Sequence, residues 1–224
     1  MSKKKTTIII SIVIICCVIM SLIDIVIKPQ YMVKSIIKIL LFLICPLIYS
    51  MYDKNLNLKL LFKANKKGLI IAILSGVVIF AIILGAYFTI GNFFDLTNIT
   101  RSLTENIGVH KDNFLWVAIY ISFVNSLLEE FFFRGFAFLT LKKFTSRKVA
   151  YIISSSAFAL YHVSMMIGWF NLVLFILSIS ALFVGGLIFN YFNEKYENIY
   201  ISWLIHMFAN FATNSIGFIL FSMV

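Results

Sequence analysis

Three charged residues interrupt a segment that is otherwise apolar enough to cross a lipid bilayer. Glu129, Glu130 and Arg134 lie within residues 114–139, whose other side chains are mostly aliphatic or aromatic. A formal charge near the centre of a bilayer costs at least about 2.5–3.5 kcal/mol, so such residues are rare and usually functional. Any fold of this chain must therefore supply these three side chains with partners or with water.

The composition is that of a polytopic membrane protein. Of the 224 residues, 62% are hydrophobic and 12% are charged, with a mean hydropathy of +1.01, whereas a soluble domain is about 45–50% apolar and about 25% charged. A spanning helix needs about 20 mainly apolar residues. We therefore expect a single all-α membrane domain over residues 1–224, a transmembrane helix bundle of seven, or eight, spans. The seven segments that qualify are 6–27, 32–52, 68–91, 114–139, 149–167, 169–191 and 199–222.

Basic residues in the loops predict the orientation, because short loops rich in Lys and Arg stay in the cytoplasm. With the amino terminus inside, the cytoplasmic segments carry 13 such residues and the outer side carries five, namely Lys28, Lys34, Lys38, Arg101 and Lys111. We expect a multi-pass protein of a bacterial cell membrane with a cytoplasmic amino terminus. The net charge of +10 then reflects topology and contact with the lipid bilayer, not nucleic acid binding.

Two further charged features have plain interpretations. The stretch 54–67 alternates leucines with lysines, which is typical of a short amphipathic helix at the cytoplasmic interface or of a solvated basic loop. Asp24 lies near a membrane edge, and we expect it to stand alone there.

Besides the charged residues of the fourth segment, two intramembrane side chains can titrate near neutral pH, namely His162 and His206. A lone membrane histidine is most often a hydrogen-bonded packing residue, but two of them together with two glutamates weaken that interpretation. At about 1.5 Å per residue, Glu129, His162 and His206 lie roughly 15, 20 and 10 Å from the cytoplasmic ends of their spans. Three helices can therefore present one polar cluster in the cytoplasmic half of the bilayer.

Helical spacing divides the charged residues of the fourth segment. Glu130 and Arg134 are four residues apart and can pair along one helix face. Glu129 points about 100° away from that face and is free for another task. Asn125, four residues before Glu129, can hydrogen-bond it.

The candidate residues suit hydrolysis of an amide by activated water. Glu129 can take a proton from water together with His162, while His206 and Asn210, which share a helix face, can stabilise an oxyanion. Alternatively, Glu129, His162 and His206 could hold a divalent metal such as zinc with an open fourth position. The sequence contains no His-Glu-x-x-His motif and no Gly-x-Ser-x-Gly motif.

These residues resemble the three ordered motifs of the CAAX prenyl protease and bacteriocin-processing family of intramembrane proteases, also called the abortive-infection family, which includes the type II CAAX endopeptidases. The matching motifs are Glu129-Glu130-x-x-x-Arg134, Phe158-x-x-x-His162 and His206-x-x-x-Asn210. The resemblance covers about 114–222, whereas 1–113 hold helices without a motif. It implies a catalytic core at 114–222, in which Glu129 and His162 activate water, His206 and Asn210 stabilise the oxyanion, and Glu130, Arg134 and Phe158 support the site. Members are described as metalloproteases, although a metal-free glutamate mechanism is also proposed for them, and we favour the latter here.

Three function classes remain. The first is an intramembrane endopeptidase that cuts a small peptide precursor or a membrane-associated substrate near the cytoplasmic leaflet. The second is a non-catalytic immunity or regulatory protein of the same fold that binds a membrane partner. The third is a proton- or cation-coupled transporter, which inverted repeats and broken helices would support and which the sequence does not favour.

Overall fold

The computed structural model describes residues 2–53, 56, 58–63 and 66–223. Within these ranges every regular element is a helix, and seven helices are long and apolar enough to cross a membrane. The expected all-α bundle is therefore confirmed. The seven spans, in chain order, are Lys3–Ile27, Tyr31–Tyr52, Lys66–Phe93, Phe114–Lys143, Arg147–Met166, Leu172–Tyr196 and Tyr200–Ser222.

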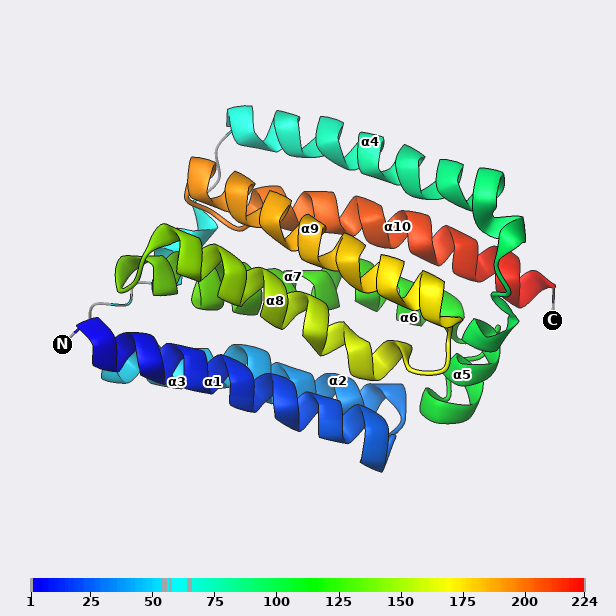
Figure 1. The fold of residues 1–224 in the computed structure, drawn as a ribbon, viewed down its shortest axis with the longest axis horizontal. Helices are drawn as coiled ribbons and strands as arrows, with labels where there is room; N and C mark the ends of the chain where they lie inside the picture. The colour runs from blue at the N-terminus through cyan, green and yellow to red at the C-terminus, as the bar shows by residue number, and fades with distance from the viewer. Residues whose placement is uncertain (1, 54–55, 57, 64–65, 224) are drawn as a thin grey trace.

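Several spans consist of more than one helical element. The α-helices labelled in Figure 1 are α1 (Ser2–Leu22), α2 (Tyr31–Ile39), α3 (Cys45–Tyr52), α4 (Lys66–Ile90), α5 (Thr97–Ile107), α6 (Phe114–Tyr120), α7 (Ser126–Glu129), α8 (Arg147–Met166), α9 (Leu172–Tyr196) and α10 (Tyr200–Ser222). Wider π-helical turns cover Ile23–Ile27, Leu40–Ile44, Ile121–Asn125 and Glu130–Thr140, and 3-10 turns cover Leu58–Phe62, Gly91–Phe93 and Leu141–Lys143.

The long helices run side by side along the long axis of the molecule (Figure 1). α8 packs against α1, against α9 and against the π-helical part of the fourth span, while α4 packs on α10 at the outer side of the bundle. Gly76 of α4 allows this last approach, because a Cβ there would lie 2.4 Å from the ring of Phe208. Small residues at such positions let membrane helices come close.

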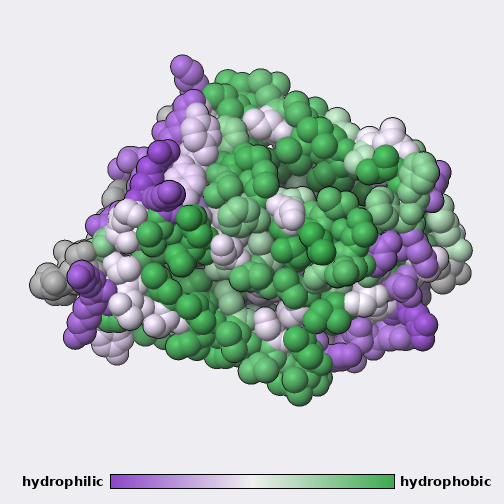
Figure 2. Space-filling view, in the orientation of Figure 1, coloured by the Kyte–Doolittle hydropathy of each residue, from purple (hydrophilic) through white to green (hydrophobic). Residues whose placement is uncertain are grey.

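The surface has the distribution expected of a multi-pass membrane protein. Figure 2 shows a broad hydrophobic region across the middle of the molecule, with hydrophilic residues gathered toward its two ends. On α4, for example, Ile70, Leu74 and Val78 are 61%, 63% and 57% exposed. Apolar side chains along a membrane-length helix can face lipid at no cost, so the chain is an integral membrane protein.

At the end of the bundle where α1 begins, contacts join segments that are distant in the sequence. Lys5 forms an ion pair with Asp53 at 2.6 Å, and the Thr6 hydroxyl donates to the carbonyl oxygen of Phe144 at 3.0 Å. In the 54–67 stretch, residues 54–55, 57 and 64–65 lie outside the described residues, and Leu58 and Leu61 are buried in a 3-10 turn. The described part of this stretch therefore packs two of its leucines on the protein, and its place at the cytoplasmic interface stays a prediction.

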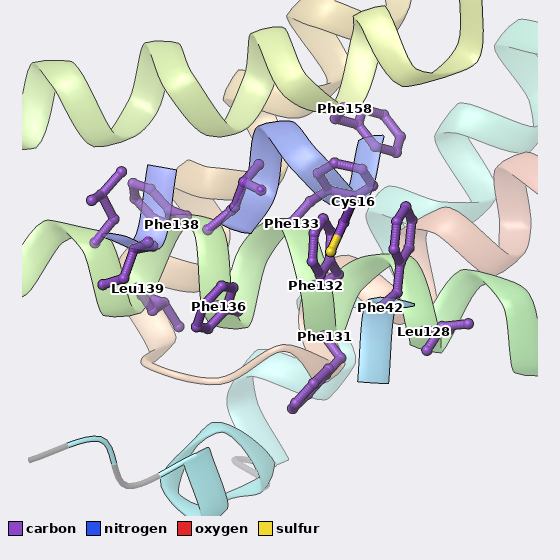
Figure 3. Close-up of a cluster of buried hydrophobic side chains, with 14 of the residues drawn as sticks. Cys16, Phe42, Leu128, Phe131, Phe132, Phe133, Phe136, Phe138, Leu139 and Phe158 are labelled. Carbon is purple, nitrogen blue, oxygen red and sulfur yellow. The ribbon is translucent and has the colours of Figure 1, made fainter. Parts of the chain in front are cut away.

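The core surrounds the second half of the fourth span. Every residue of Glu130–Thr140 is buried, and its phenylalanines fill the space between the neighbouring helices (Figure 3). Phe42 from the second span stacks on Phe132 with ring centroids 4.1 Å apart, and Phe158 of α8 meets the edge of Phe133 at 5.4 Å. This aromatic packing fixes the position of the charged residues at the start of the segment.

Candidate active site

Glu129 lies at the end of α7 and is only 2% exposed. Its Oε1 atom accepts a hydrogen bond from Asn125 Nδ2 at 3.0 Å, as the spacing of the two residues predicts. The same oxygen accepts from Lys38 Nζ at 2.5 Å, a contact that the sequence did not suggest. One carboxylate oxygen is therefore held by two donors, and the other is directed elsewhere.

The second oxygen, Glu129 Oε2, faces the two histidines. It lies 3.8 Å from His162 Nε2 of α8 and 3.8 Å from His206 Nε2 of α10. His162 Nδ1 lies 2.7 Å from the Phe158 carbonyl oxygen, which can only accept, so Nδ1 donates and Nε2 carries a lone pair. The structure thus brings the side chains of Glu129, His162 and His206 together, although they come from three different spans.

Glu130 and Arg134 form a fully buried pair beside this cluster. Glu130 Oε1 lies 2.9 Å from His206 Nδ1, and Glu130 Oε2 lies 3.4 Å from Arg134 Nε. The guanidinium rests on aromatic faces, with its carbon 3.9 Å from the ring centre of Phe158 and 5.0 Å from that of Phe189. Cation–π contacts of this kind favour a desolvated arginine. Phe158 thereby contacts Arg134 and also packs against His162, with ring centroids 4.8 Å apart.

Asn210 occupies a different position from the other candidates. Its Nδ2 donates to the carbonyl oxygen of Ile121 at 3.2 Å, in the π-helical turns that precede α7. One helical turn further along α10, Asn214 Nδ2 donates to the Ala118 carbonyl oxygen at 3.2 Å. These asparagines tie α10 to the first half of the fourth span. Within the described part of the chain, Asn210 makes no hydrogen bond to Glu129, and its predicted role as an oxyanion donor stays a prediction.

The expectation that Lys34 and Lys38 lie in an outer loop is wrong. Both belong to α2 inside the second span, and they are only 6% and 5% exposed. Long lysine side chains near a helix end usually extend to the interface, so an outward assignment was the simpler one. Two lysines one turn apart among isoleucines were the signal that could have identified them.

Asp24 is also not alone. Its Oδ1 lies 2.6 Å from Lys34 Nζ, and the Ser164 hydroxyl donates to its Oδ2 at 3.3 Å. The buried charges of the described spans therefore balance in sign, since Asp24, Glu129 and Glu130 are matched by Lys34, Lys38 and Arg134. In low dielectric, charges persist only when they are paired in this way.

The alternative zinc site would use Glu129, His162 and His206 as its ligands. Among the described residues, no group of three or more His, Cys, Asp or Glu side chains is arranged to hold a metal ion. The ammonium of Lys38 also occupies Oε1 of Glu129, which places a positive charge against the central ligand of the proposed set. The residues as they are placed do not fit a zinc ion.

Fold and site together define a multi-pass membrane protein that holds two carboxylates and two imidazoles inside its bundle. Residues 111–212 match the model of the family Rce1-like, described as type II CAAX prenyl endopeptidase Rce1-like. The matched region, which contains all three motifs, is therefore similar to a family of CAAX-type intramembrane proteases. Comparisons with curated proteins and with solved structures gave no significant match.

Burial of the Glu130–Arg134 pair predicts a large loss of stability when one partner is removed. Arg134→Met should destabilise the protein by about 3–5 kcal/mol, because it leaves Glu130 as an uncompensated buried charge. The measurement is thermal or chemical unfolding of the purified protein in detergent.

Arg101→Met is a matched control. Arg101 and Glu105 form another i,i+4 pair, but their side chains are 72% and 61% exposed, so their loss should change stability little. Equal losses for the two variants would contradict the assignment of Arg134.

Proposed function

We propose that this protein is an intramembrane endopeptidase in which Glu129 activates water with the help of two histidines. The observation that carries the proposal is that Oε2 of Glu129 faces Nε2 of both His162 and His206, while Oε1 is held by other donors. Separations of 3.8 Å are too long for direct hydrogen bonds and suit a bridging water. The match of residues 111–212 to the family Rce1-like supports proteolysis as the reaction class.

The proposed reaction is a direct attack of water on a peptide carbonyl. Glu129 removes a proton from a water molecule that His162 also orients, and the water oxygen forms a bond to the carbonyl carbon. The carbon–nitrogen bond then breaks, and the proton on Glu129 passes to the leaving amine. The remaining proton of the water passes from the new carboxylic acid to the amine, so the products leave as a carboxylate and an ammonium group. Atoms and charges then balance without a covalent enzyme intermediate.

Developing negative charge on the carbonyl oxygen needs a donor. His206 is suited to this role because Glu130 holds its Nδ1, so that a second proton on Nε2 would create a donor facing the reacting atoms. Asn210 is the further donor that we propose for the oxyanion. A small rotation of its amide away from the Ile121 carbonyl would be required for that role.

The substrate that we propose is a small peptide precursor or a membrane-associated peptide that reaches the site from the cytoplasmic leaflet. Because the site lies inside the bundle, we propose that the substrate enters it from the lipid or from the cytoplasmic end. In a bacterial membrane, a peptide that is processed during export or signalling fits better than a prenylated protein.

We also propose that the amino terminus is cytoplasmic. In support, the amino terminus, the segment after α3 and the loop before α8 lie at one end of the bundle, and these segments hold most of the lysines (Figure 1). With Lys34 and Lys38 assigned to the second span, the outer side keeps only Lys28, Arg101 and Lys111 of the five basic residues counted there.

Cysteine labelling tests this orientation. In a background without Cys16, Cys17 and Cys45, a cysteine at position 111 should react with an impermeant maleimide added to intact cells. A cysteine at position 4 should react only after the membrane is opened. The reverse pattern would contradict the orientation.

Metal-independent water activation predicts that chelation leaves activity intact. Because Glu129 is paired with an ammonium group, we expect cleavage by the purified protein to be unchanged after prolonged chelator treatment. Elemental analysis of the same sample serves as its control. Loss of cleavage that zinc restores would overturn the metal-free mechanism.

Removal of the base should abolish processing. Glu129→Gln should reduce cleavage at least about 100-fold, since a positioned general base contributes about 10²–10⁴-fold. The readout is a comparison, by mass spectrometry, of new peptide ends in membranes that contain the parent or the variant. Glu129→Asp keeps the charge and retracts the carboxylate, so it should be folded and also strongly impaired.

Glu105→Gln is the matched control, because Glu105 is an exposed glutamate outside the spans. Its peptide ends should equal those of the parent. If Glu129→Gln is correctly inserted and produces the same peptide ends as the parent, proteolysis by this site is excluded. A biological phenotype that survives in that variant would instead indicate a non-catalytic immunity or regulatory protein.

A further inference from the structure

We infer that Lys38, from the amino-terminal half of the chain, is a positioning residue for the catalytic carboxylate of Glu129. The inference rests on the proposed function and adds a part of the site that the family match does not contain. That match begins at residue 111, whereas Lys38 lies on α2. The first helices of the bundle would then contribute to the reaction and not only to the packing.

The contacts of Lys38 are directed at Glu129. Its Nζ lies 2.5 Å from Glu129 Oε1 and 2.6 Å from Asn125 Oδ1, and Asn125 in turn donates to the same glutamate oxygen at 3.0 Å. The ammonium also lies near two aromatic rings, with the ring centres of Tyr161 and Phe42 at 4.8 and 5.6 Å. Lysine, asparagine and glutamate thus close a triangle of hydrogen bonds on one carboxylate oxygen.

This triangle determines which way the carboxylate points. A carboxylate with both oxygens free can rotate about its last bond, whereas two donors on Oε1 fix the plane of the group. Oε2 is then the oxygen presented to His162 and His206, as observed. Placement of a catalytic group by neighbours that do not touch the substrate is a common requirement for efficient chemistry.

The positive charge has a second effect, because it compensates a carboxylate that is buried in low dielectric. The other charged groups near this site already have partners of their own. Arg134 is beside Glu130, and Lys34 is beside Asp24. Lys38 is therefore the cation that compensates Glu129 among the described residues.

A double-mutant cycle, measured by thermal unfolding, tests the Lys38–Glu129 pair without any need for a substrate. Lys38→Met and Glu129→Gln should each lower the unfolding midpoint of the purified protein, because each leaves one uncompensated buried charge. The double variant should recover most of that loss. Additive losses would overturn the pairing.

Lys34 supplies the matched control for this cycle, since it is a buried lysine one turn away on the same helix. Lys34→Met should couple with Asp24→Asn and should not couple with Glu129→Gln. If Lys34→Met and Lys38→Met couple equally to Glu129→Gln, the coupling reports only the total buried charge and not a specific contact. That result would also overturn the inference.

Cleavage kinetics of Lys38 variants distinguish a role in positioning Glu129 from a role in stability. With a peptide that the parent cleaves in reconstituted vesicles, Lys38→Met should lower kcat by about 100-fold, the effect of a misplaced catalytic group, with KM unchanged. Lys38→Arg, which keeps a charged donor, should restore part of kcat. An unchanged kcat in a folded Lys38→Met protein would overturn the role.

The same kinetics distinguish failure of the proposed proteolytic function from failure of the proposed role of Lys38. A parent protein that cleaves no peptide would overturn the proposed function and, with it, any role of Lys38 in catalysis. An active parent with an equally active Lys38→Met variant would leave the proposed function intact and overturn the role of Lys38 alone.

Discussion

Charge compensation in a low-dielectric interior is the constraint on which this structure depends. Each buried acid has a basic partner within reach, and the tightest of these contacts is that of Lys38 with Glu129. Removing a partner leaves a charge that neither lipid nor aromatic side chains can solvate. The first, second and fourth spans must therefore pack together, because the ion pairs connect them.

Compensation on one side of Glu129 leaves its other side available for chemistry. Lys38 and Asn125 occupy Oε1, so Oε2 meets the imidazoles of His162 and His206. The phenylalanines of Glu130–Thr140 hold this arrangement from behind, in a segment that is buried throughout (Figure 3). Rigid support of this kind suits the role that we propose for Glu129, the activation of water.

Much of this arrangement could be predicted from the sequence, because charged residues in apolar helices are few and their motifs are ordered. The spans follow from the lengths of the apolar segments. The Glu130–Arg134 pair and the Asn125–Glu129 contact follow from the spacing of four residues along one helix. The partners from other helices do not, since nothing local shows that Lys38 turns inward instead of extending to the interface. The expectation that Asp24 stands alone is wrong for the same reason, since its partners Lys34 and Ser164 lie on other helices. The π-helical turns after Glu129 also change which side chains share a face, so an α-helical projection loses accuracy there.

The contact between Lys38 and Glu129 inside a lipid bilayer is the most direct test of this account. Solid-state NMR of the protein in membranes, with lysine ¹⁵Nζ and glutamate ¹³Cδ labels, measures whether the two groups are dipole-coupled. We predict a Lys38–Glu129 coupling that disappears in Lys38→Met and persists in Lys34→Met, whose lysine pairs with an aspartate. The Lys142–Glu194 pair should give a second coupling that both variants keep. A spectrum that Lys38→Met leaves unchanged would contradict the account.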